Sequence, residues 1–145
     1  MKLVWIAALL LTGTFGFAQA PADSMPSAAP VKQLMTELIH PASNDILLSI
    51  FRGGPGSESE WEAVRHNALI LAESGNLLMM RGRARDQAEW TKDVKLLVDA
   101  GNAAYKSAQS KDVKALTAVA GLLDASCLTC HKQYRRDVFP RETSK

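Results

Sequence analysis

The sequence has few cysteines and few aromatic residues, and neither sign of charge is in clear excess. Of its 145 residues, 6% are aromatic, and 17 Lys and Arg residues face 15 Asp and Glu residues, for a formal net charge of +2. Such a balance, without a basic patch spaced by aromatic residues, argues against binding to nucleic acid. Strand-like alternation of useful length is also missing, which argues against a sheet. With 47% hydrophobic residues, the chain fits one globular domain.

Only the N-terminus carries a conspicuous unbroken apolar run. Lys2 precedes apolar residues 3–11, and small residues follow, which is typical of an export signal. Cleavage is predicted after Ala18, because a second site two residues later would leave Pro21 beside the scissile bond. The run is shorter than the roughly 20 residues of a membrane-spanning helix. We therefore expect a signal peptide over 1–18, a periplasmic protein, and no stable membrane insertion after cleavage.

Composition divides the rest of the chain into three parts. Residues 19–30 are rich in Pro, Ala and Ser without an apolar period, so they are predicted to form a flexible arm. Residues 31–140 show helical periodicity and are predicted to form the folded domain, and residues 141–145 a short C-terminal tail.

The first expected helix contains a proline. Pro41 cannot donate a hydrogen bond to the carbonyl of Glu37, and it pushes His40 away from helical dihedral angles. The sequence predicts a kinked helix ended by the glycine-rich residues 53–56, with a break into two short helices as the alternative. Its apolar stripe comprises Val31, Leu34, Met35, Leu38, Ala42, Ile46 and Ile50.

Three further helices are marked by capping residues and apolar stripes. One is predicted over 58–80, one from about residue 87 to Ser110, and one from residue 113 to a stop at Pro140. Four amphipathic helices with short connections predict an all-α antiparallel four-helix bundle. The expected caps are Ser57 with Glu60, Asp86 with Glu89, and Asp112; the stripes run from Trp61 to Met79, from Trp90 to Ala108 and from Val113 to Val138.

The two cysteines are the most informative residues. Cys127 and Cys130 are followed at once by His131, which is the spacing of a c-type haem attachment site. On a helix, residues at i, i+3 and i+4 share a face, so both sulfurs and the imidazole point the same way. The thiols would add to the two haem vinyl groups as thioethers, and the histidine would supply a neutral nitrogen to iron. One covalent haem c on the last helix is predicted.

Three other interpretations of these cysteines are less favoured. A redox Cys-x-x-Cys pair usually follows a strand and opens a helix. A structural zinc site would need a fourth ligand from His40 or His66, and normally a second tight pair. A disulfide would strain an intact helix and would leave His131 without a role.

The segment Cys127-Leu-Thr-Cys130-His131-Lys-Gln-Tyr134-Arg135, near the end of an exported helical chain, resembles class II cytochromes c, the cytochrome c prime group. The resemblance in layout covers residues 31–140. It implies a four-helix bundle with haem buried between helices and no substrate turnover. Members of the group divide into five-coordinate high-spin proteins, which bind gases on an apolar distal face, and six-coordinate low-spin proteins with a methionine from the first helix.

The resemblance also suggests the sixth ligand. The segment Lys32-Gln33-Leu34-Met35 is similar to the first helix of the methionine-ligated members, which implies that Met35 binds iron; simple core packing is the alternative. The other possible donors are weaker: His40 beside the proline, His66 off its stripe, Met79 at the end of a core stripe, and a peripheral Met80.

Cations matter because haem propionates are anionic. Arg135 lies four residues after His131 and can follow the haem edge, whereas Arg81, Arg83 and Arg85 are expected to be solvated loop residues. Cations near the end of the last helix also have a helix-dipole explanation.

The sequence thus predicts a periplasmic monohaem electron carrier, not an enzyme, that works with redox partner proteins. A homodimer is compatible with the sequence, which does not determine the oligomeric state. A five-coordinate protein that traps or senses nitric oxide or carbon monoxide is the alternative. A third interpretation is an assembly protein docked in a larger respiratory complex.

Overall fold

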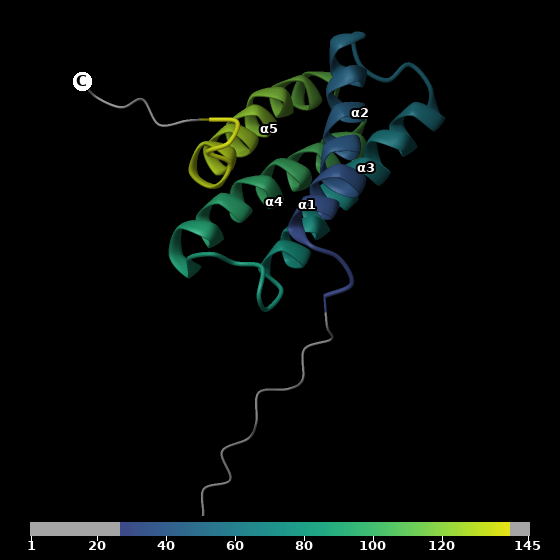
Figure 1. Cartoon of the computed structure of the whole chain (residues 1–145). Helices are drawn as coiled ribbons and strands as arrows, with labels where there is room; N and C mark the ends of the chain where they lie inside the picture. Colours follow the sequence, from purple (N-terminus) through teal and green to yellow (C-terminus); the bar gives the residue numbers. More distant parts are fainter. Residues whose placement is uncertain (1–26, 140–145) are drawn as a thin grey trace, which may run out of the picture.

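The computed structural model describes residues 27–139, in which every regular element is a helix (Figure 1). The predicted signal peptide, most of the predicted arm, Pro140 and the C-terminal tail lie outside these residues. The first three elements run on without interruption, so four helices pack together, as the periodicity predicted. The elements are α1 (Val31–Leu34), the π-helix η1 (Met35–Ile39), α2 (His40–Phe51), α3 (Glu58–Met79), α4 (Gln87–Ser110) and α5 (Val113–Tyr134).

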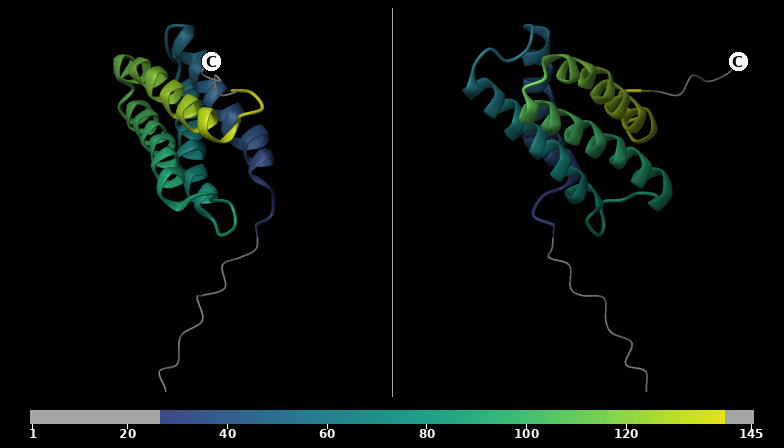
Figure 2. Two further views of the ribbon diagram at one scale, coloured as in Figure 1. Left: turned by 60° about the vertical axis from the view of Figure 1, so that its left-hand side comes forward. Right: turned by 180° about the vertical axis from the view of Figure 1, so that it is seen from behind.

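Short loops place neighbouring helices side by side in opposite directions. Helix α4 packs against both α3 and α5, and the first helix packs against α3 (Figures 1 and 2). The start of α5 lies beside the end of the first helix, where a Cβ added to Gly54 would be 2.8 Å from Val113. The second half of α5 projects away from this contact (Figure 2).

The first helix neither breaks nor keeps α-helical geometry at its proline. The backbone N–H of His40 donates to the carbonyl of Met35, five residues back, and this bond closes the π-helical turn directly before Pro41. The wider turn relieves the clash between a proline ring and the preceding turn of helix. It also moves the apolar stripe by one residue, so Ile39 is buried and Leu38, which the stripe predicted, is only half-buried.

The predicted caps form as the sequence indicates. Ser57 and Glu60 make a reciprocal capping box at the start of α3. The Asp86 carboxylate accepts from the backbone N–H groups of Glu89 and Trp90, and Asp112 accepts from that of Ala115. These bonds satisfy helix N–H groups that have no partner within the helix, which explains why the starts of three helices were predictable.

The prediction that the last helix continues to Pro140 was wrong. Helix α5 ends at Tyr134, and the backbone N–H groups of Val138 and Phe139 both donate to the carbonyl of Arg135. This turn carries the chain off the helix axis, and Val138 is 54% exposed rather than part of the core.

Glycines let α3 and α4 approach closely. A Cβ on Gly101 would lie 2.6 Å from the backbone nitrogen of Ala72, and one on Gly75 would lie 2.1 Å from a methyl group of Val98. The apolar core is continuous across all four helices. Its fully buried side chains include Ile46, Leu71, Leu116, Val119 and Leu123.

We predict that Gly101→Ala lowers the free energy of unfolding by about 1 to 3 kcal/mol, because its methyl group would collide with the backbone of α3. Gly121→Ala is the matched control, since a Cβ there meets nothing within 4 Å. That control should raise stability by about 0.5 to 1 kcal/mol through helix propensity. Urea unfolding followed by circular dichroism measures both. Equal effects of the two substitutions would contradict the close approach.

Candidate functional site

Cys127, Cys130 and His131 lie on one face of α5 in its last two turns. All three side chains are partly buried, and both cysteines are free thiols. The predicted arrangement on a single face is therefore present, and the alternative of a disulfide between these two residues is not formed. Their helix is also the one described helix that is long and apolar enough to cross a membrane. This property concerns only the length and composition of the helix. Of its most apolar 18-residue stretch, 22% is buried.

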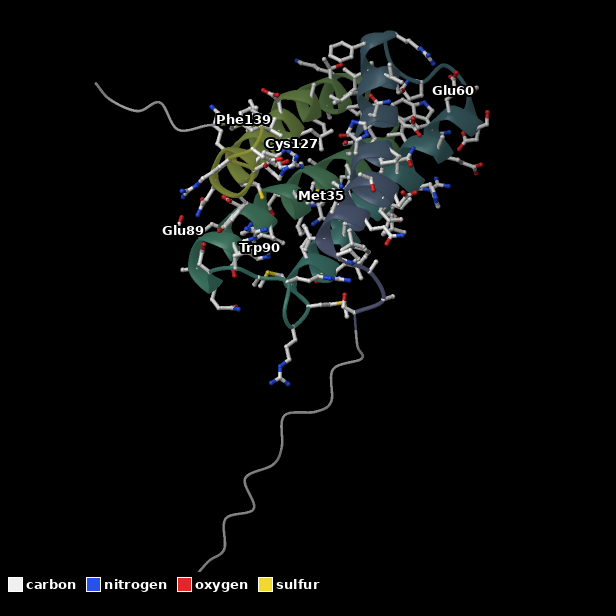
Figure 3. All side chains as sticks on the ribbon, in the orientation of Figure 1. Met35, Glu60, Glu89, Trp90, Cys127 and Phe139 are labelled. Atoms are coloured by element: carbon white, nitrogen blue, oxygen red, sulfur yellow. The ribbon has the colours of Figure 1, made fainter. Side chains whose placement is uncertain are left out.

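A groove of about 1810 Å³ opens between the second half of α5, the start of the first helix and the loop between α3 and α4. Cys130 and His131 line it from α5, and Met35 lines it from η1. Its volume exceeds the roughly 300 to 1,000 Å³ of pockets for drug-sized ligands. Cys127 is not among the lining residues, although it shares the α5 face (Figure 3). The groove therefore brings together three of the four predicted sulfur and nitrogen donors.

Burial governs the protonation of these groups. It raises the pKa of the Cys127 thiol, and together with the nearby Asp93 carboxyl it raises the pKa of Cys130 to about 11. Burial also lowers the pKa of His131, helped by the positive charge of Arg135. At neutral pH both cysteines are thus thiols and the imidazole is neutral, which is the form that binds a metal.

The other predicted donors lie elsewhere. His40 and His66 are exposed. Met79 is 37% exposed rather than at the end of a core stripe, and Leu78 is buried in its place. Within residues 27–139, no group of three or more His, Cys, Asp and Glu side chains is close enough together to hold a metal ion.

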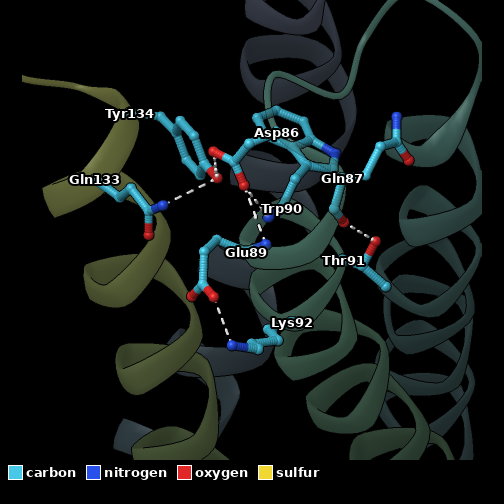
Figure 4. Close-up of polar contacts among 8 residues, drawn as sticks. All are labelled: Asp86, Gln87, Glu89, Trp90, Thr91, Lys92, Gln133 and Tyr134. Carbon is cyan, nitrogen blue, oxygen red and sulfur yellow. Dashed lines mark hydrogen bonds and ion pairs between the residues drawn. The ribbon is translucent and has the colours of Figure 1, made fainter.

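Tyr134 fastens the end of α5 to the start of α4 (Figure 4). Its hydroxyl donates to the Asp86 carboxylate at 2.8 Å, and its ring meets Trp90 edge to face at a centroid distance of 4.9 Å. The indole N–H of Trp90 donates in turn to the carbonyl of Leu78 on α3. These contacts join three helices beside the groove, and an apolar stripe was the sequence signal for part of this cluster.

Four arginines were considered from the sequence, and the surroundings of one of them, Arg83, differ from the prediction. Arg135 lines the groove, but its guanidinium is paired with the Asp137 carboxylate through Nε and Nη2. Arg81 and Arg85 are exposed loop residues, as predicted. The prediction that Arg83 is solvated was wrong, because it is only 9% exposed.

The buried arginine also holds residues that were predicted to belong to the flexible arm. The guanidinium of Arg83 donates to the hydroxyl of Ser27 and to the carbonyls of Ala29 and Leu77. Residues 27–30 therefore form one wall of the groove instead of extending from the domain. No periodic pattern marks a single arginine in a loop for burial, so sequence reasoning had no signal for this contact.

Charge is distributed unevenly around the groove. It is lined by seven of the 14 Lys and Arg residues and by two of the 13 Asp and Glu residues in the described part of the chain. The remainder of that part carries seven cationic and eleven acidic side chains. Both acidic residues of the groove, Asp86 and Asp137, already accept hydrogen bonds from protein groups. The residues that line the groove are therefore net positive, and the rest of the described chain is net negative.

A scan of protein-family models, a search of curated proteins and a search of solved structures each found no match for this chain. The features that bear on function are therefore the side chains of Met35, Cys130 and His131 in the groove and the positive charge around them.

We predict that Tyr134→Phe raises the pKa of Asp86 toward its ordinary value of 3.8. The tyrosine hydroxyl is the main cause of the lowered pKa, and the backbone N–H groups of Trp90 and Glu89 keep part of the effect. Because the folded-state pKa is depressed, ionised Asp86 stabilises the fold above its ordinary pKa, and this contribution is lost as pH falls through the folded value. The substitution should therefore reduce the amount of folding free energy that is lost when the protein is acidified.

Carbon-13 NMR titration of the carboxyl groups measures the pKa of Asp86. Gln133→Ala is the control, since Gln133 donates to the same hydroxyl without touching the carboxylate. An unchanged pKa of Asp86 in Tyr134→Phe would show that the hydroxyl does not stabilise the carboxylate.

Proposed function

We propose that this chain is a periplasmic monohaem c-type cytochrome that carries electrons and is not an enzyme. One haem would be held covalently by Cys127 and Cys130, and His131 and Met35 would bind its iron. The observation that carries the proposal is that His131 and Cys130, from the last helix, and Met35, from the first, line the same groove.

The residues present fit such a group. Two thiols and a neutral imidazole lie on one face of α5, and the Met35 thioether lines the same groove as Cys130 and His131. The groove is large, and its cations suit a ligand that is apolar in its body and anionic at its edge. In class II cytochromes c, which the sequence resembles, the haem likewise lies between the helices of a four-helix bundle.

Haem supplies a one-electron couple between Fe(III) and Fe(II) when it is bound. The neutral nitrogen of His131 and the soft sulfur of Met35 would help to set the reduction potential of that couple. The buried core beneath the groove would limit access of water from one side. The polypeptide would thus tune a potential and hold the group in place, without proton transfer to a substrate.

Redox partners with an acidic face fit this surface. The positive groove and the negative remainder give the protein a charge asymmetry that would orient it toward such a partner. Nitric oxide or carbon monoxide would become the ligand only if Met35 left the iron accessible. Spin state and ligation therefore decide between electron transfer and gas binding.

We predict that the protein produced in cells with haem-maturation machinery carries one covalent haem. The mature mass should equal that of the processed chain plus one haem, and a denaturing gel should stain for haem, because thioether bonds survive unfolding. Replacing Cys127 and Cys130 together by Ala should abolish the stain. His131→Ala should keep the thioethers and change the spin state. A haem-free mature chain from competent cells would refute the proposal.

We predict a low-spin oxidised spectrum with a weak methionine-to-iron absorption near the red end. Met35→Ala should convert the protein to the high-spin form and allow the reduced state to bind carbon monoxide readily, because it removes the thioether on the side of the groove opposite His131. Met79→Ala is the matched control, since Met79 does not line the groove. Absorption spectra with and without carbon monoxide measure both variants.

Two results would contradict His/Met ligation. One is a wild-type protein that is already five-coordinate, which would favour the gas-binding alternative. The other is a low-spin spectrum that persists in Met35→Ala and disappears in His40→Ala.

A further inference from the structure

The first helix lacks the N-terminal cap that the other three packed helices have. Pro30 stands before Val31, its side chain makes no capping hydrogen bond, and no acidic residue lies in the first turn. The carbonyl of Pro30 accepts from the backbone N–H groups of Gln33 and Leu34. The chain then leaves α-helical geometry at Met35, after four residues. One uncapped turn is not stable by itself, so the position of this helix start depends on contacts with the rest of the fold.

Arg83, in the loop between α3 and α4, supplies such contacts. One terminal nitrogen of its guanidinium, Nη2, donates to the Ser27 hydroxyl and, at 2.9 Å, to the Ala29 carbonyl. The Ser27 hydroxyl itself donates to the Ala29 carbonyl, which joins the two acceptors to each other. The other terminal nitrogen, Nη1, donates to the Leu77 carbonyl and to the Met80 sulfur at the end of α3. We call the contacts of Arg83 with Ser27 and Ala29 the Arg83 bridge, because they connect the residues before the first helix to the end of α3.

The same end of α3 also holds the helix that carries His131. The Leu78 carbonyl accepts from the indole N–H of Trp90, and the ring of Trp90 meets that of Tyr134 at the end of α5. The Leu77 carbonyl, one residue earlier, is the α3 carbonyl that accepts from the guanidinium. The two helices that contribute the proposed iron ligands are therefore both positioned from one end of α3.

We propose that Arg83 is a positioning residue for Met35, and that the Arg83 bridge fixes the start of the first helix so that the Met35 thioether stays on the iron. The proposal rests on the proposed function, because the iron belongs to the haem held by α5. Without the bridge, the first helix would keep its core contacts after the proline, at Ile46 and Ile50, while its start would be free to move from the groove. Arg83 would then decide how much of the iron is open to a gas.

The test uses the complete haem-loaded protein. The side chain of Arg83→Gln is too short to reach both the segment 27–30 and the end of α3. The variant should bind carbon monoxide in the reduced state about 10-fold more tightly than the wild type, which is the effect expected from losing hydrogen bonds of a charged group. Gas affinity rises with the fraction of protein in which Met35 has left the iron. The methionine-to-iron absorption of the oxidised state should weaken in parallel, which a merely structural role of Arg83 would not cause.

Two neighbouring arginines provide matched controls. Arg81→Gln and Arg85→Gln each remove one positive charge from the same loop, and both side chains are exposed. Neither makes a hydrogen bond to the segment 27–30 within the described residues. Both variants should therefore keep the carbon monoxide affinity and the methionine-to-iron absorption of the wild type.

Ser27→Ala tests the Arg83 bridge without changing a charge. It removes one of the two acceptors, so it should raise the carbon monoxide affinity by less than Arg83→Gln does. The double variant should do no more than Arg83→Gln alone, because both substitutions act through one contact. Additive effects would overturn the bridge. If Arg83→Gln fails to fold, Ser27→Ala decides the matter, since Ser27 is exposed and a wild-type affinity in that variant would also overturn the bridge.

The outcomes separate this proposal from the proposed function. A mature chain without covalent haem would refute the cytochrome, and the positioning role of Arg83 with it. A low-spin wild type that turns high-spin in Met35→Ala, together with an unchanged spectrum and gas affinity in Arg83→Gln, would overturn the role of Arg83 alone. An equal rise of gas affinity in Arg81→Gln, Arg83→Gln and Arg85→Gln would overturn it as well, because that result would show an effect of charge rather than of the bridge.

Discussion

The geometry of the groove depends on one missing hydrogen-bond donor in the first helix. Pro41 has no backbone N–H, and the chain widens the turn before it, with His40 donating to the carbonyl of Met35. Residues on either side of the wide turn then follow different angular positions around the helix. Ile46 and Ile50 face the core after it, and Met35, at the start of the turn, reaches the groove. A regular α-helix would have kept all these residues on one stripe, as the sequence pattern assumed.

The two halves of helix α5 lie in different surroundings. Its first half buries Leu116, Val119 and Leu123 in the common core, next to the first helix and α4. Its second half diverges from the first helix, and Cys130 and His131 line the groove between them. The contacts of Tyr134 with Asp86 and Trp90 attach the end of this half to the start of α4. The apolar character of α5 and its low burial are thus consistent with a helix whose second half faces a groove.

Local chemistry explains which features the sequence predicted. Caps such as Ser57, Asp86 and Asp112 act within four residues, and the spacing of Cys127, Cys130 and His131 follows from the pitch of one helix. The end of α5 and the π-helical turn before Pro41 were not predictable in the same way, because the local sequence at each is compatible with more than one backbone conformation. The burial of Arg83 depended on acceptors 54 and 56 residues away in the chain. Periodicity carries no information at that distance.

The charges around the groove would act on the reduction potential of any redox group bound there. A buried cation such as Arg83 disfavours the oxidised, more positive state of an iron centre and so raises its reduction potential. The rim cations act in the same direction as Arg83 but are weakened by solvent and salt. The potential of a redox group in the groove would therefore respond more strongly to this one buried arginine than to the several exposed charges around it.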